Sequence, residues 1–207
     1  MLKYLKPNKI FLYFFFVTIG FLNIFYQINF EDFWLDEMQS FWIADPELSW
    51  DETFQRQKYD YHNPILFNLA LKYFLDIFSY NPEIARYLPL IFGFIFLIII
   101  GPITYQVKKD NSFLLVAILA CLSIYTIKYS QEVRPYALLL LTSSLNIYFF
   151  LKVCNEVENR KKNTIFFIFF SVFNYSTNPF SLIIFFSQFF FVFYKYFLFK
   201  KKFLQFN

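Results

Sequence analysis

Glycine, histidine and cysteine are scarce in this chain of 207 residues, and each scarcity excludes a class of site. Three scattered glycines cannot form a GxGxxG phosphate loop, and a single histidine excludes a histidine-rich metal site. The two cysteines, Cys121 and Cys154, lie inside and at the end of apolar segments, so a disulfide framework is not expected. Charged residues make up only 16% of the chain, against roughly 25% in a typical soluble domain.

Apolar residues make up 58% of the chain, and they are grouped in long blocks. A helix needs roughly 20 apolar residues to cross the hydrocarbon core of a membrane. The chain is therefore predicted to be an all-α integral membrane protein with about six transmembrane helices. The predicted spans are residues 10–29, 84–106, 112–129, 135–152, 164–178 and 179–197. The first span follows three lysines and precedes no small-residue cleavage site, so we interpret it as a retained signal-anchor.

Basic residues are distributed unevenly among the predicted loops. Four clusters hold most of the 19 lysines and arginines, and the loops between them hold most of the 15 acidic residues. The clusters are Lys3 to Lys9, Lys108–Lys109, Lys152 to Lys162, and Lys195 to Lys202. Because cytoplasmic loops carry an excess of lysine and arginine, these clusters are predicted to be cytoplasmic. The N-terminus then lies in the cytoplasm, and the acidic loop of residues 30–80 lies outside.

The outer loop is predicted to contain short helices at the membrane surface, over residues 36–44, 46–58 and 64–78. In the last of these, polar residues recur every four positions, at Asn68, Lys72 and Asp76, and form a stripe on one face. A helix of this kind fits a position in the interface, and a span there would invert the charge distribution of the loops that follow. The whole chain, residues 1–207, is thus interpreted as a single transmembrane module.

Prolines predict where several helices begin. Asparagine or aspartate before a proline provides an N-cap residue followed by proline at the first helical position. This pattern occurs at Asp45–Pro46, Asn63–Pro64, Asn81–Pro82 and Asn178–Pro179. Pro89 and Pro102 fall inside the predicted span 84–106 and are expected to bend it.

Charged residues are predicted to converge at the outer face, where ionised groups beside hydrocarbon favour a function. A carboxylate can accept a proton from an attacking hydroxyl, and a cation can hold a phosphate and stabilise it as it leaves. The candidate catalytic residues are Asp36 and Glu37, and the candidate substrate- or phosphate-binding residues are His62, Arg86, Glu132 and Arg134. Structural alternatives stay open, because the acids can be solvated, the arginines can reach lipid headgroups, and the histidine can cap or pack.

Four sequence elements occur in a fixed order over most of residues 30–152: "WLDEMQSFW", "YHNPILFN", "ARYLPLIF" and "QEVRPYAL". Together they resemble elements of the polytopic GT-C glycosyltransferases, in the protein O-mannosyltransferase-type branch. That branch includes lipopolysaccharide glycosyltransferases and the aminoarabinose transferase of lipid A. Asn63 replaces the first proline of the usual "HPP" segment, and Gln39 stands where the aminoarabinose transferases have arginine.

The resemblance implies a glycosyltransferase that uses a polyprenyl-phosphate-linked sugar at the outer face of the cytoplasmic (inner) membrane. Asp36 would be the general base on the acceptor hydroxyl, and Glu37 would help to position the acceptor or the donor phosphate. The donor phosphate would be contacted by His62, Arg86 and Arg134. The acceptor would be a glycan, a lipid or a protein, and no nucleic-acid partner is expected. The sequence pattern requires no cofactor. The acidic residues of the outer loop could hold a divalent cation through their oxygen atoms, so this alternative stays open.

Two other functions stay open. A polytopic transporter or flippase would place ionisable residues near the bilayer midplane, whereas here they are predicted at helix ends. A non-catalytic subunit would keep the fold without needing Asp36. Members of the family are much longer than this chain, so it is expected to be a fragment, a split gene product that needs a second chain, or a degenerate copy.

Overall fold

The computed structural model describes residues 7–60, 64–108, 110–155 and 159–204, and every regular element in these ranges is a helix. The expected all-α class is therefore confirmed. Three helical stretches are long and apolar enough to cross a membrane. They are α1 (Pro7–Phe25), α6 (Tyr87–Lys108) together with the short α5 (Pro82–Ala85) before it, and α9 (Tyr136–Asn155).

A fourth crossing is formed if α7 (Ser112–Leu122) and α8 (Ile124–Gln131) act as one span, although they are bent by 53° relative to each other. Ser123 lies at the break, has an extended backbone conformation, and caps α8 by accepting a hydrogen bond from the Thr126 N–H at 3.4 Å. Serine side chains compete with the helix for backbone partners in this way. The predicted span 112–129 is therefore interrupted.

The last two helices, α10 (Arg160–Thr177) and α11 (Ser181–Leu204), do not qualify as spans on length and composition. The first turn of α10 is basic, and the apolar part of α11, Ser181–Phe197, is short. The described residues thus contain three or four helices compatible with a membrane protein, and the predicted count of six is not confirmed.

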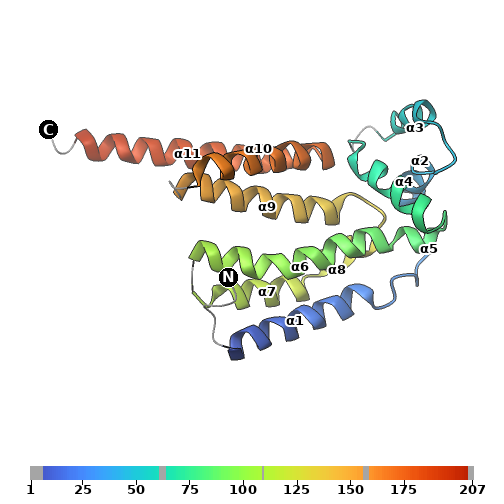
Figure 1. Ribbon diagram of the computed structural model, residues 1–207, viewed down its shortest axis with the longest axis horizontal. Helices are drawn as coiled ribbons and strands as arrows, with labels where there is room; N and C mark the ends of the chain where they lie inside the picture. Colours follow the sequence, from blue (N-terminus) through green and yellow to red (C-terminus); the bar gives the residue numbers. More distant parts are fainter. Residues whose placement is uncertain (1–6, 61–63, 109, 156–158, 205–207) are drawn as a thin grey trace.

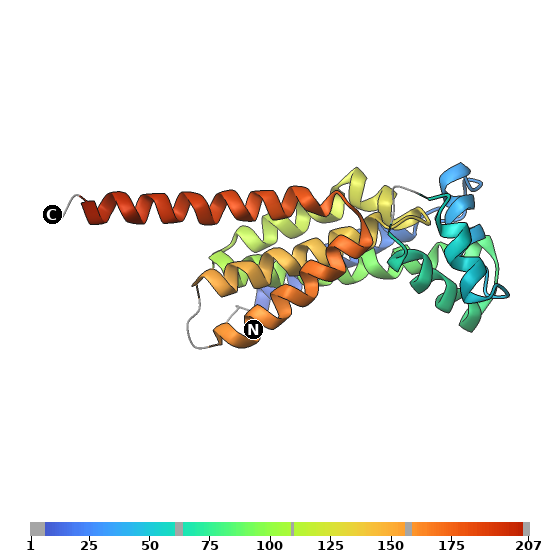
Figure 2. The ribbon, with the colours of Figure 1, turned by 90° about the horizontal axis from the view of Figure 1, so that it is seen from above.

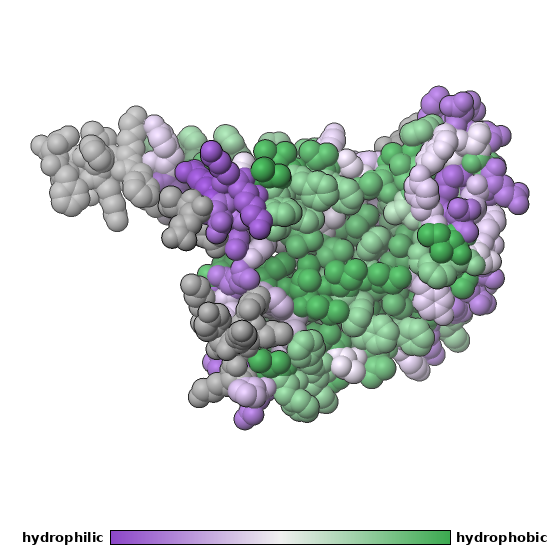
Figure 3. All heavy atoms as spheres, viewed as in Figure 1, coloured by the Kyte–Doolittle hydropathy of each residue, from purple (hydrophilic) through white to green (hydrophobic). Residues whose placement is uncertain are grey.

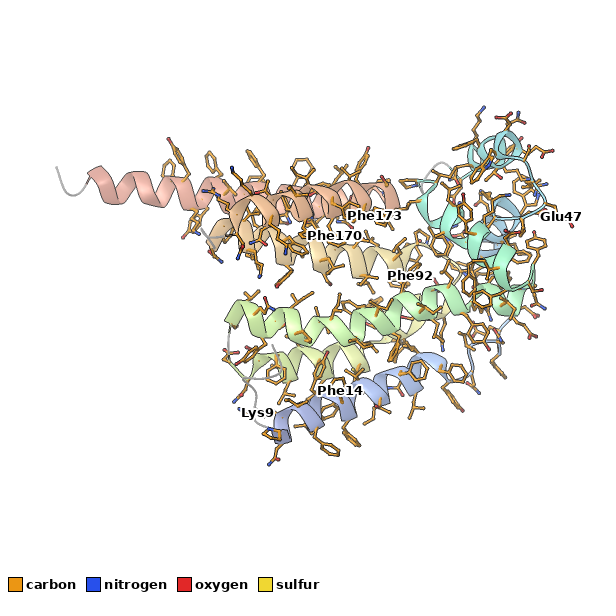
Figure 4. All side chains as sticks on the ribbon, in the orientation of Figure 1. Lys9, Phe14, Glu47, Phe92, Phe170 and Phe173 are labelled. Carbon is orange, nitrogen blue, oxygen red and sulfur yellow. The ribbon has the colours of Figure 1, made fainter. Side chains whose placement is uncertain are left out.

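The long helices run side by side, and α6 packs against α1, α7, α8 and α9 (Figure 1). Helix α10 packs mainly on α9, and α11 extends past the other helices at its C-terminal end (Figure 2). An apolar surface lies between two more polar ends of the bundle (Figure 3). Lys9 lies at one end of the bundle, where α6 and α9 end, and Glu47 lies at the opposite end (Figure 4). The basic ends of these helices and the acidic loop therefore lie at opposite ends of the molecule.

The acidic loop folds into short helices at its end of the bundle (Figure 1). They are α2 (Leu35–Ile43), α3 (Trp50–Gln57), α4 (Leu66–Phe78) and the α5 turn. The expected helices 36–44 and 64–78 are present within two residues of their predicted ends. The expected helix 46–58 begins later, because Ser49 is the N-cap residue and forms a capping box with Glu52. Asp45 instead accepts a hydrogen bond from the Glu47 N–H within a turn.

The other proline predictions have mixed outcomes. Asn81 caps α5 as expected, with its side chain accepting from the Glu83 N–H at 2.8 Å. Asn178 begins a turn instead, and α11 starts three residues later. Asn63 lies outside the described residues. Pro89 has no N–H to bond the Ala85 carbonyl, and α5 and α6 are separated immediately after Ala85.

Pro102 is accommodated inside α6 by a side chain from α1. Because proline has no N–H, the Ile98 carbonyl four residues earlier has no helical donor. The Tyr13 hydroxyl oxygen lies 2.6 Å from that carbonyl oxygen and 2.9 Å from the Leu97 carbonyl oxygen, so it can donate to either. Gly101 leaves room for the ring, since a Cβ at this position would collide with it. A tyrosine on α1 thus supplies the hydrogen bond that the proline removes from α6.

A buried network of uncharged polar side chains joins α9, α10 and α11. Asn146 Nδ2 donates to Ser171 Oγ at 2.8 Å, and Gln188 Nε2 donates to Asn146 Oδ1 at 2.6 Å. Thr142 Oγ1 donates to Asn174 Oδ1 at 2.9 Å. Polar side chains that bond across helices in apolar surroundings specify which helix faces meet. The network therefore fixes how the last two helices pack against α9.

Candidate functional site

A pocket of about 610 Å³ opens at the end of the bundle that carries α2 to α5. It lies between the end of α1, the start of α2 and the C-terminal turn of α8. The charged residues of its lining are Glu31, Asp32, Glu37, Arg86, Lys128 and Glu132, and the aromatic ones are Tyr26, Phe30 and Trp34. Nine of the fourteen lining residues are polar or charged, and four acids stand against two bases, so this is a polar cleft rather than an apolar ligand cavity.

Glu37 and Arg86 form a buried ion pair in the wall of this pocket. Arg86 Nη2 donates to Glu37 Oε2 at 3.1 Å, and Arg86 Nε donates to Glu37 Oε1 at 3.3 Å. Glu37 Oε1 also accepts from the Val133 N–H at 2.9 Å. Two-point contacts between guanidinium and carboxylate are strong and directional. The pair therefore links the start of α2 to the start of α6 and to the turn after α8.

Arg86 also holds the segment between α1 and α2. Its Nη1 donates to the Ile28 carbonyl at 2.9 Å and to the Glu31 carbonyl at 2.6 Å. Gln27, in the same segment, has a φ of 55°, which is uncommon for a residue other than glycine. Every guanidinium nitrogen of Arg86 thus has a protein acceptor.

Arg134, in the turn between α8 and α9, makes a second buried cross-link. Its Nη1 donates to the Asp36 carbonyl at 3.1 Å and to Ser40 Oγ at 3.2 Å, and lies 3.5 Å from Asp60 Oδ2. Its Nη2 lies 3.9 Å from Asp36 Oδ2. Its Nε is buried and has no hydrogen-bond partner among the described residues. An unpaired buried N–H is costly, so this nitrogen is an unsatisfied polar atom within the cross-link.

Asp36 and Glu37 both lie in the first turn of α2, where the helix dipole stabilises carboxylates. Consecutive residues lie about 100° apart around a helix, so the two side chains face different surroundings. The Glu37 side chain is 2% exposed, whereas that of Asp36 is 48% exposed. Asp36 is therefore the member of the pair that a substrate can reach.

Lys128 and Glu132 form an ion pair at the pocket, with Lys128 Nζ 3.5 Å from Glu132 Oε1. Burial raises the pKa of the Glu132 carboxyl above its ordinary value, and the nearby Lys128 ammonium opposes that shift. The Lys128 side chain is 62% exposed, in contrast to the enclosed Arg86. Lys128 thus presents a positive charge that an anionic group in the pocket can meet.

The turn between α8 and α9 connects these groups to α1 as well. Gln131 Nε2 donates to the Ile24 carbonyl at 3.1 Å and to the Tyr26 carbonyl at 2.8 Å. The last carbonyls of a helix lack intrahelical donors, so this amide caps the end of α1. Residues 131–134 therefore contact α1, α2 and the segment that follows α3.

Three of the six predicted site residues, Glu37, Arg86 and Glu132, line the pocket. Asp36 and Arg134 do not line it and form an ion pair with each other at the same end of the bundle. His62, the sixth, lies outside the described residues. The roles assigned to them remain predictions.

Sequence reasoning did not assign Ser40, Asn68 or Lys72 to this region. Ser40 lies four residues after Asp36, and that spacing on α2 is a signal for a shared helix face. Asn68 and Lys72 belong to the polar stripe of α4, but they are buried against α3 and the turn before it.

No group of three or more histidine, cysteine, aspartate or glutamate side chains in the described ranges is arranged to hold a metal ion. Comparison with protein-family models, curated proteins and solved structures gives no match to this chain.

Proposed function

We propose that the chain is a membrane glycosyltransferase that moves a sugar from a polyprenyl-phosphate-linked donor to an acceptor hydroxyl. The observation that carries this proposal is the pairing of Asp36 with Arg134. The exposed Asp36 carboxylate lies 3.9 Å from a buried guanidinium whose Nε has no partner among the described residues. A base beside an anion-binding donor, at the polar end of an apolar bundle, suits a reaction on a lipid-linked phosphate.

In the proposed reaction the acceptor oxygen attacks the anomeric carbon of the donor sugar. Asp36 accepts the proton of the acceptor hydroxyl as the new bond forms. The bond between the anomeric carbon and the phosphate oxygen breaks, and its electron pair leaves with polyprenyl phosphate. Attack from the face opposite the leaving group inverts the anomeric configuration. The acceptor is a glycan, a lipid or a protein of the cell envelope.

The Lys128 ammonium, which lines the pocket, and the positive charge of the Arg134 guanidinium beside Asp36 are proposed to support the negative charge of the departing phosphate. The buried pair of Glu37 and Arg86 holds the wall of the pocket, because both groups are already engaged with protein partners. Glu132 lines the same pocket and holds Lys128 near it. His62 remains a predicted contact of the donor phosphate.

We also propose that six helices cross the inner membrane, with the N-terminus in the cytoplasm and α2 to α5 outside. Helices α10 and α11 lie alongside α9, which supports counting them as crossings (Figure 2). Cysteine labelling with a membrane-impermeant maleimide in intact cells tests the orientation, in a background without native cysteines. Glu47→Cys should react and Lys108→Cys should be protected. The reverse pattern would refute this topology.

A transfer assay in proteoliposomes tests the enzymatic proposal. Polyprenyl-phosphate-linked hexoses and pentoses serve as donors, and an envelope glycolipid extract serves as the acceptor. Asp36→Asn is expected to lower the rate by about 10²- to 10⁴-fold. Asp51→Asn, a matched change at an exposed acid in the first turn of α3, should leave the rate unchanged. Equal rates for wild type and Asp36→Asn would refute the role of Asp36 as general base. Absence of transfer by the wild type would refute the proposal that the chain is a glycosyltransferase.

Transport of a lipid-linked sugar is the second candidate function, favoured by the break between α7 and α8. Discontinuous helices are common in transporters. The buried hydrogen bonds between α9, α10 and α11, however, involve only uncharged side chains, and the contact of Lys195 with Asn155 is exposed at the end of α9, which disfavours an ion-coupled path between these helices. The same proteoliposomes separate the two functions, since a transporter moves the intact donor across the bilayer and Asp36→Asn retains that movement.

A further inference from the structure

The Lys72 ammonium, on α4, is enclosed by the turn between α2 and α3. Lys72 Nζ donates to the Asp45 carbonyl at 2.6 Å and to the Leu48 carbonyl at 2.8 Å, and lies 3.4 Å from the Pro46 carbonyl oxygen. The residue is buried. Charge-assisted hydrogen bonds of this kind are stronger than neutral ones. One side chain therefore fixes the turn that ends α2 and precedes α3.

Asn68 lies one turn earlier on the same face of α4 and binds the other end of α3. Its Nδ2 donates to Gln57 Oε1 at 2.7 Å, and it is fully enclosed. Gln57 Nε2 in turn lies 3.5 Å from the Asp60 carbonyl oxygen. One face of α4 thus holds α3 at both of its ends.

Helix α3 is connected to Asp36 at two places. Arg56 Nη1 donates to the Trp42 carbonyl at 2.7 Å, which ties α3 to the last turn of α2. Beyond the end of α3, Asp60 Oδ2 lies 3.5 Å from Arg134 Nη1, which also donates to the Asp36 carbonyl. A displacement of α3 would therefore move both ends of α2, the helix that carries Asp36.

We propose that Asn68 and Lys72 are positioning residues that hold Asp36 in place through α3, Asp60 and Arg134. This inference rests on the proposed function of Asp36 as the general base. Neither residue lines the pocket, so donor binding does not depend on them directly. Displacing a reacting group by about 1 Å can cost on the order of a hundredfold in rate. Loss of Lys72 is therefore expected to lower kcat by roughly ten- to a hundredfold and to leave the KM for the donor unchanged.

The test compares Lys72→Met and Asn68→Leu with Lys58→Met, which removes an exposed lysine at the end of α3. The full-length variants are reconstituted in nanodiscs and examined by hydrogen–deuterium exchange and by the transfer assay. In Lys72→Met and Asn68→Leu, exchange should rise in α3 and in α2, and not in α6 or α9. Lys58→Met should exchange and react like the wild type.

Faster exchange in α3 with α2 unchanged would overturn the inference, whatever happens to the transfer rate. Faster exchange throughout α6 and α9 would overturn it too, because the two residues would then support the whole fold. A higher donor KM with an unchanged kcat would contradict a positioning role. Failure of the proposed function is a separate result, since Asp36→Asn would then react like the wild type while the exchange in α2 still responds to Lys72→Met.

Discussion

Replacing Tyr13 with phenylalanine tests how α1 and α6 are held together. The substitution removes the hydroxyl and keeps the ring, which packs against Phe113 and beside Gly101. The Ile98 carbonyl then loses the donor that lies 2.6 Å away. Pro102 cannot replace it, because proline has no N–H.

The expected magnitude follows from leaving one acceptor unpaired between apolar helices. An unsatisfied buried acceptor costs about 1–3 kcal/mol, and measured hydrogen bonds between membrane helices reach at most about 1.7 kcal/mol. We therefore expect Tyr13→Phe to lower the free energy of unfolding by about 1–2 kcal/mol. In a Pro102→Ala background the restored N–H can bond the Ile98 carbonyl. The same substitution should then cost about 1 kcal/mol less.

The assay is reversible unfolding in mixed micelles followed by circular dichroism, applied to the wild type, the two single variants and the double variant. Tyr105→Phe is the matched control, because its ring also packs on Phe113 while its hydroxyl bonds no described residue. Equal costs of Tyr13→Phe in the two backgrounds, to within about 0.5 kcal/mol, would show that the hydroxyl does not compensate for Pro102, because independent sites are additive to that extent.

Three further predictions concern packing, the buried ion pair and pH. Gly93→Ala should destabilise the fold by about 1–3 kcal/mol, because a Cβ there would lie 2.6 Å from Ser130 Cβ. Adding Ser130→Gly should recover most of that loss in thermal unfolding. Arg86→Met should cost about 3–5 kcal/mol by leaving the Glu37 charge unpaired, and the double variant with Glu37→Met should be more stable than Arg86→Met alone. Because burial raises the pKa of Glu132 above the ordinary 4.5, the folded state binds its proton more tightly, and wild-type stability should fall as pH rises above about 4.5. Glu132→Gln should lose this part of the pH dependence, and an unchanged pH profile would contradict the assignment.

The sequence predicts the long helices well because apolar length is a local property of the chain. Helices α1, α6 and α9 overlap the predicted spans 10–29, 84–106 and 135–152. The break at Ser123 is not visible in the apolar pattern, because it depends on a serine side chain bonding the backbone instead of solvent. The accommodation of Pro102 inside α6 likewise depends on the Tyr13 hydroxyl of another helix, and a local sequence pattern cannot predict that contact.

The proximity of the candidate residues could be predicted from the sequence, whereas their individual environments could not. Charged residues at helix ends on one side of a bundle must lie in the same layer, and Asp36, Arg86 and Arg134 do so. The rotation of α2 decides that Glu37 is enclosed while Asp36 is accessible, and that rotation depends on tertiary packing. For α4, periodicity shows that Asn68 and Lys72 share a face. It cannot show that α3 covers that face.

The turn of residues 131–134 ties the start of α2, which carries Asp36, to the rest of the bundle. Gln131 binds the end of α1, Val133 binds the Glu37 carboxylate, and Arg134 binds the backbone of Asp36. Burying Glu37 and the two arginines that meet α2 is a weak source of stability, because desolvation offsets much of the attraction. Buried charges that fix the backbone of Asp36 while adding little net stability fit the proposed catalytic role, because preorganisation holds reacting groups in place before the reaction begins. The buried charges around Asp36 therefore support its proposed role more strongly than its own exposure does.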